Sequence, residues 1–140
     1  MRTTPLASNI SRSVTVGLLG ATIAVPGTGF SMVIPPLAVA AGTRITVTAL
    51  AGSNVAYEFA PHGIHFLLPL VATQSLQNMQ NPPSGLLGLH LGYFPDPTHV
   101  TTVTELLNVN VDLLGLSATS SIWHFSGYIF VGGDDNGNPF

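Results

Sequence analysis

The chain has 140 residues, the length of one domain and enough to bury a core without disulfides. Charged residues make up 6% of the sequence, against about 25% in an average soluble domain, and there is no lysine. A net charge of −3 argues against a nucleic-acid binder, and the lack of cysteine excludes disulfides, thiolate metal sites and cysteine nucleophiles.

The first apolar run is Val14–Val25, which follows Arg2 and Arg12. The hydrophobic region of a secretory signal peptide has this character. The glycines inside the run and the Pro-Gly pair after it favour a first strand instead, and the run is too short to cross a bilayer as a helix. We expect a flexible N-terminal segment over residues 1–13, one domain over residues 14–132 and a flexible tail over residues 133–140.

Short apolar runs separated by turn residues continue along the chain. The clearest is Thr43–Leu50, in which Ile45, Val47 and Ala49 alternate with polar residues. In the longer run at 100–112, Glu105 falls on the apolar face, so either a bulge re-aims it or the run is two pieces. The other predicted strands are Phe30–Ile34, Val55–Phe59, the region of Phe66, Leu68 and Leu70, Gly88–Phe94 and Ser120–Val131, with a polar connection from Thr73 to Leu87. About eight or nine short strands predict an all-β fold, a two-sheet antiparallel β-sandwich.

The most distinctive stretch is Phe59–Leu70, FAPHGIHFLLPL, which predicts two strands around a corner. In the corner proline fixes φ, glycine allows a positive φ, and the histidine bonds a backbone carbonyl. His62 and His65 also suggest a metal site, which His90 and His99 would have to complete through the fold. No further ligand lies nearby in sequence, so we predict no metal and no cofactor.

The runs Ile34–Val39, Thr43–Thr48 and Phe59–Leu70 together resemble a ZU5 domain. The family shows a proline-containing strand end, a Thr-rich strand and then a P-H-G-apolar-x-F-x-x-P segment, and the segment HFSGY near the C-terminus resembles the end of bacterial ZU5-like proteins. One departure is Leu37, where the family usually has glycine. The positions of the P-H-G segment that match are Pro61, His62, Gly63, Ile64, Phe66 and Pro69. The resemblance implies a β-sandwich that serves as an interaction module, in bacteria within exported or surface-attached proteins.

The segment His124-Phe125-Ser126 is the sharpest chemical candidate, because some ZU5-containing proteins cleave themselves within a His-Phe-Ser motif. There, Ser126 would attack the Phe125 carbonyl with His124 as base, and an ester would form and be hydrolysed. The scissile bond would also have to be strained. The alternative is a closing strand in which Trp123, Phe125, Ile129 and Val131 fill the core, Ser126-Gly127 forms a kink and Tyr128 caps an edge. Sequence does not report strain, so both interpretations remain open.

We therefore predict a non-enzymatic structural or interaction module, located outside the cell, on its surface or in the periplasm. Its partner would be an unknown protein or a neighbouring domain, with no nucleic acid and no transmembrane segment. Uncharged strand edges make self-association an expectation. The alternative is self-cleavage between Phe125 and Ser126. A sugar-binding sandwich would need exposed aromatic side chains, for which the candidates are Trp123, Tyr93, Phe94 and Tyr128.

Overall fold

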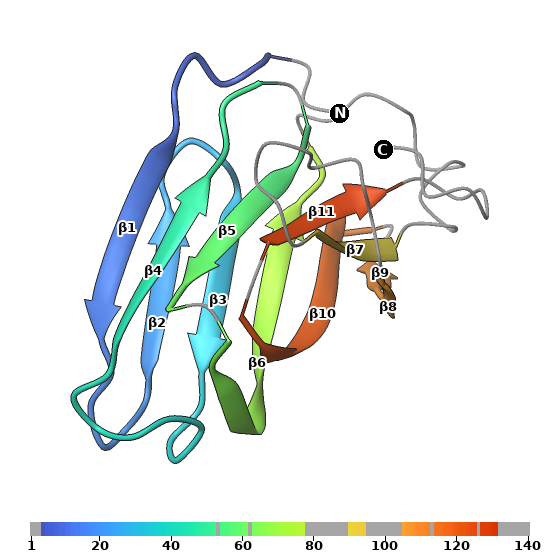
Figure 1. Cartoon of the computed structure of the whole chain (residues 1–140). Helices are drawn as coiled ribbons and strands as arrows, with labels where there is room; N and C mark the ends of the chain where they lie inside the picture. Colours follow the sequence, from blue (N-terminus) through green and yellow to red (C-terminus); the bar gives the residue numbers. More distant parts are fainter. Residues whose placement is uncertain are drawn as a thin grey trace.

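Two antiparallel β-sheets contain the strands of the computed structural model, which describes residues 4–52, 54–61, 63–77, 90–94, 105–112, 114–125 and 127–131. The strands are β1 (Ile10–Thr15), β2 (Ala21–Val25), β3 (Phe30–Ile34), β4 (Arg44–Ala49), β5 (Ala56–Ala60), β6 (His65–Ser75), β7 (His90–Phe94), β8 (Glu105–Asn108), β9 (Asn110–Asp112), β10 (Ser117–His124) and β11 (Gly127–Val131). One sheet has the order β1-β4-β5-β11-β7-β8, and the other has the order β2-β3-β6-β10-β9 (Figure 1). The described ranges contain no helix. The predicted all-β sandwich is confirmed.

The described residues form eleven strands, more than the eight or nine predicted, and the difference has one main cause. The runs Val14–Val25 and Ser120–Val131 were each predicted as one strand, and the run at 100–112 was left open between one bulged strand and two pieces. Each run contains parts of two strands that lie in different sheets. The chain bends from one sheet to the other inside each run, which is how sandwich corners form. For the run that holds Glu105, the alternative of two pieces is the one observed.

The first sheet begins earlier in the chain than predicted. Strand β1 starts at Ile10 and pairs with β4 over its whole length, so the predicted boundary between residues 13 and 14 falls inside a strand. The predicted tail at 133–140 lies outside the described residues.

Strand β4 shows why these residues form a sandwich. Its apolar residues Ile45, Val47 and Ala49 are fully buried between the sheets, as predicted. On the other face, Thr46 bonds the Ser13 hydroxyl of β1 at 2.7 Å, and Thr48 bonds Ser11 in the same way at 2.8 Å. The strand therefore packs one face and pairs hydroxyl groups on the other, which an almost uncharged sequence can do.

The core between the sheets contains the polar side chain of Gln74, a residue predicted to lie in a polar connection. That prediction is wrong, because β6 continues to Ser75 and Gln74 is fully buried. Its amide nitrogen donates to the carbonyls of Thr28 at 2.7 Å and Ser75 at 2.9 Å, and its oxygen accepts from the Tyr57 hydroxyl. Burial is tolerated because these hydrogen bonds replace water.

Candidate functional site

Two corners of the sandwich lie side by side. In one, the chain passes from β5 to β6 through Pro61 and Ile64; in the other, it passes from β10 to β11 through Phe125 (Figure 1). The Phe125 N–H donates to the Ile64 carbonyl at 3.0 Å, and the Gly63 N–H donates to the Phe125 carbonyl at 3.3 Å. The two motifs singled out in the sequence are therefore hydrogen-bonded to each other.

The residues of the P-H-G corner behave as a structural turn. Gly63 has a φ of +77°, the left-handed conformation that glycine adopts at little cost. Pro61 is exposed, Phe66 is buried and Pro69 is half-buried. His62 lies outside the described residues, so its predicted bond to a carbonyl stays a prediction.

Aromatic rings join the two corners beneath the surface. The Phe125 ring is buried, stacks on Phe59 with centroids 5.2 Å apart, and meets Phe66 edge-on at 4.7 Å. The ring centroid of Tyr128 lies 5.6 Å from that of Phe59, and Tyr128 is buried as well. The prediction that Tyr128 caps an edge is wrong, because β11 runs between β5 and β7 and places this ring inside the core.

Trp123 was predicted to fill the core and is instead 53% exposed. The cause is a bulge: Ile122 pairs with Leu70 and His124 with His65, so Trp123 alone faces four residues of β6. The bulge also exposes Leu68, which was predicted to share the buried face of Phe66 and Leu70.

Among the four aromatic candidates for sugar binding, Trp123 is exposed, whereas Phe94 and Tyr128 are buried. The Tyr93 side chain lies outside the described residues. The described candidates thus provide one exposed ring and no row of rings.

One hydrogen-bond donor that self-cleavage would need lies at the Phe125 carbonyl. The Gly63 N–H points at the oxygen that would carry negative charge during attack, which is the position of an oxyanion donor. The left-handed φ values of non-glycine residues in the described ranges are at Leu37 and Leu116, and neither adjoins this bond. Ser126 lies outside those ranges.

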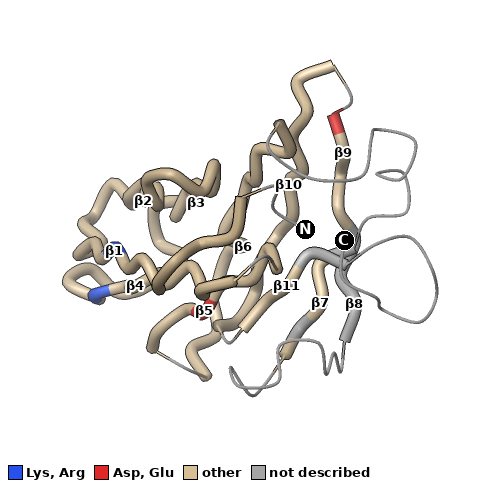
Figure 2. Tube along the Cα trace, turned by 90° about the horizontal axis from the view of Figure 1, so that it is seen from above, with Lys and Arg blue, Asp and Glu red and all other residues tan. Residues whose placement is uncertain are grey.

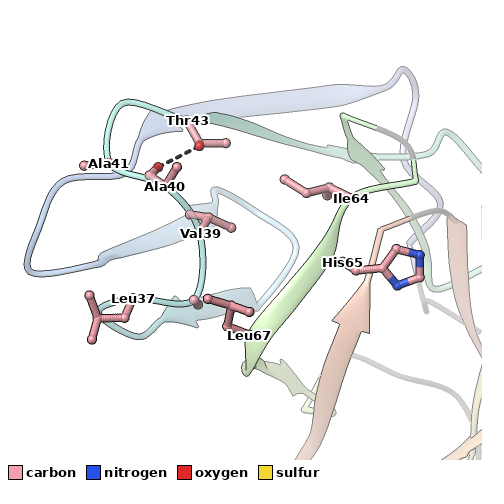
Figure 3. Close-up of a pocket in the computed structure, with 9 residues that line it drawn as sticks. Leu37, Val39, Ala40, Ala41, Thr43, Ile64, His65 and Leu67 are labelled. Carbon is pink, nitrogen blue, oxygen red and sulfur yellow. Dashed lines mark hydrogen bonds between the residues drawn. The ribbon is translucent and has the colours of Figure 1, made fainter.

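A pocket of about 570 Å³ lies next to the corners, between the loop that joins β3 to β4 and the start of β6. Its lining is almost wholly apolar: Leu37, Ala38, Val39, Ala40, Ala41, Thr43, Ile64, His65 and Leu67. Figure 3 shows the His65 ring turned away from the loop, towards β10. The pocket is therefore a mostly apolar cavity, and none of these residues points a catalytic group into it.

Hydrogen bonds hold the pocket loop in one conformation. The Leu67 N–H donates to the Ala38 carbonyl at 3.2 Å, and the Thr43 hydroxyl donates to the Ala40 carbonyl at 2.6 Å. Leu37, at the tip of this loop, has a φ of +70° and is 73% exposed. A leucine in this conformation is strained, and little of its side chain is buried.

Exposed apolar side chains continue from the pocket across the five-stranded sheet. We call this set the apolar ridge: Val33, Leu37, Leu67, Leu68, Val71 and Trp123. Val33 and Val71 are direct partners on β3 and β6, and Leu67 is 81% exposed. Sequence reasoning missed the ridge, although one signal was present: the adjacent pair Leu67-Leu68 breaks the alternation of a flat strand, so one of the two had to be exposed or bulged.

Comparisons with known proteins name no family. Neither protein-family models nor curated proteins match the chain. Within the described residues there is no cluster of three or more His, Asp or Glu side chains that could hold a metal ion. The described part of the chain also lacks a helix long and apolar enough to span a membrane.

Proposed function

We propose that this protein is a non-enzymatic interaction module, a β-sandwich that binds the apolar surface of another protein. Its assignment to an exported or surface-attached bacterial protein is supported by the sequence resemblance to bacterial ZU5-like proteins. The observation that carries the interaction function is the apolar ridge, whose exposed side chains lie on the pocket loop and on the neighbouring strands β3, β6 and β10. Exposed apolar side chains that gather on one face mark binding surfaces in soluble proteins.

Charge and rigidity support the same conclusion. Strands β3, β6 and β10 contain no Lys, Arg, Asp or Glu. The charged residues whose side chains the structure describes lie elsewhere, at Arg12, Arg44, Glu58 and Asp112 (Figure 2). A partner therefore needs an apolar surface and no charge complement. The pocket loop is already held by hydrogen bonds, so binding costs little ordering entropy.

The experiment is a selection of peptides from a random display library on immobilised protein, with sedimentation velocity run beside it to detect self-association. The test variant is Leu67→Ser with Trp123→Ser, and the matched control is Leu19→Ser, since Leu19 is 90% exposed and lies outside the ridge. We expect enrichment of apolar peptides, or dimers, with the wild type and the control and neither with the test variant. A wild type that enriches no peptide and stays monomeric would contradict the proposal.

The second candidate function is self-cleavage between Phe125 and Ser126, and the Gly63 donor at the Phe125 carbonyl favours it. The test is the mass of the purified chain under denaturing conditions, with Ser126→Ala beside it. Fragments that end at Phe125 and begin at Ser126, seen in the wild type alone, would establish this chemistry. An intact mass of 14.6 kDa in the wild type would exclude it.

A further inference from the structure

Two histidines that are 59 positions apart in sequence meet where the two corners touch. His65 on β6 is the direct cross-strand partner of His124 on β10, and their ring centroids are 5.7 Å apart at an interplanar angle of 46°. His65 is exposed and His124 is half-buried, so solvent reaches the pair from one side. The sequence suggested His62, His90 and His99 as partners of His65, and the pairing with His124 was not predicted.

The separation of the two rings fits a shared metal ion. A metal–nitrogen bond of about 2.1 Å puts each ring centre roughly 3.2 Å from the ion, so two imidazoles at a tetrahedral angle have centres about 5.2 Å apart. The observed 5.7 Å exceeds this by a margin that small rotations of the side chains supply. Backbone movement is not required, because the two residues are already register partners.

Tyr128 contacts His124 at both its backbone and its ring. Its hydroxyl donates to the His124 carbonyl at 2.7 Å and lies 3.5 Å from His124 Nδ1. The contact at Nδ1 restricts rotation of the His124 ring. Metal-binding histidines are commonly oriented in this way by a partner on the other nitrogen.

We propose that His65 and His124 form a two-histidine site for a divalent transition-metal ion, of which Zn²⁺, Cu²⁺ and Ni²⁺ are the ions that imidazole ligands suit. Water completes the coordination on the exposed side. With two protein ligands, the affinity should be below that of closed four-ligand zinc sites. The site uses no side chain of the apolar ridge as a ligand, and it does not rest on the proposed interaction function.

The chain contains a built-in reporter, because its one tryptophan, Trp123, precedes His124. Titration with Cu²⁺ or Ni²⁺ should quench its fluorescence with saturation at one equivalent, and calorimetry with Zn²⁺ should give the same stoichiometry. We expect His65→Ala and His65→Gln to weaken binding at least tenfold. The matched control is His90→Ala, on β7 of the other sheet, which should bind as the wild type does.

The His65 variants carry the test because this side chain is exposed and its loss should leave the fold intact, which circular dichroism checks. His124→Ala is added as a second arm and is interpreted with the same check. Binding that is unchanged in the His65 variants would overturn the proposal, as would a wild type that shows no saturable binding or a His90→Ala variant that loses it.

Discussion

The glycine of the HFSGY segment gives the sharpest test of how side chains pack on the six-stranded sheet. Gly127 is the cross-strand partner of Phe94, and a Cβ atom added at this glycine would lie 2.1, 2.4 and 2.5 Å from three carbons of the Phe94 ring. Carbon atoms in contact are separated by about 3.5–4.0 Å, so the ring would have to retreat by more than about 1 Å. Phe94 is itself buried against Ala56 and Ile129, which leaves it little room to move.

We therefore expect Gly127→Ala to destabilise the fold by about 2–3 kcal/mol, the usual cost of overpacking a well-filled core. For a chain of this length, thermal unfolding should shift down by about 6–12 °C, which circular dichroism would measure. The control is Gly17→Ala, because Gly17 has no left-handed φ and its added Cβ would meet no atom within 4 Å. In a Phe94→Leu background the cost of Gly127→Ala should shrink. Equal melting temperatures for the two alanine variants would refute the packing argument.

Three further predictions concern stability and are checked by urea unfolding. Gln74→Met should lower the free energy of unfolding by about 2–3 kcal/mol, because the Tyr57 hydroxyl and the Thr28 carbonyl lose their hydrogen bonds to Gln74. Tyr57→Phe should lower it less, by about 1–2 kcal/mol, because one hydrogen bond is lost. Equal losses in the two variants would contradict this order. Leu37→Gly should stabilise the fold by about 0.5–1 kcal/mol by relieving the left-handed φ, and Leu37→Ala should not. Ser13→Ala, which removes an exposed hydroxyl pair with Thr46, should change stability by less than about 0.5 kcal/mol, and a larger loss would show that the pair is not a surface contact.

The alternation of apolar residues predicted the sandwich and much of its core but not where the chain changes sheets. Val47 and Phe59 were placed correctly because each lies in a strand that stays within one sheet. The run Ser120–Val131 was predicted as one strand, since a strand that bends at Phe125 into the other sheet keeps its apolar character on both sides of the bend. The periodicity of apolar residues does not change at such a bend, so it cannot predict where the bend lies.

The errors at the candidate site have the same origin. Trp123 was assigned to the core because aromatic residues in strands are usually buried, but a bulge in the neighbouring strand moved it to the surface. A bulge in one strand cannot be read from the sequence of its partner. The pairing of His65 with His124 depends on long-range register in the same way, and no local motif carries it.

The central position of β11 has a consequence for any break in the chain at Phe125. This strand is hydrogen-bonded to β5 on one side and to β7 on the other, and its Tyr128 and Ile129 side chains are buried. A chain cut before it would therefore remain a tight noncovalent complex, held as a split protein holds its complementing fragment. Such a complex would elute as one species in size-exclusion chromatography under native conditions and would keep its circular dichroism spectrum. In denaturant it would separate into two fragments. Conversely, a peptide with the sequence of residues 127–131 and its flanks is the natural insert for a chain that lacks this strand.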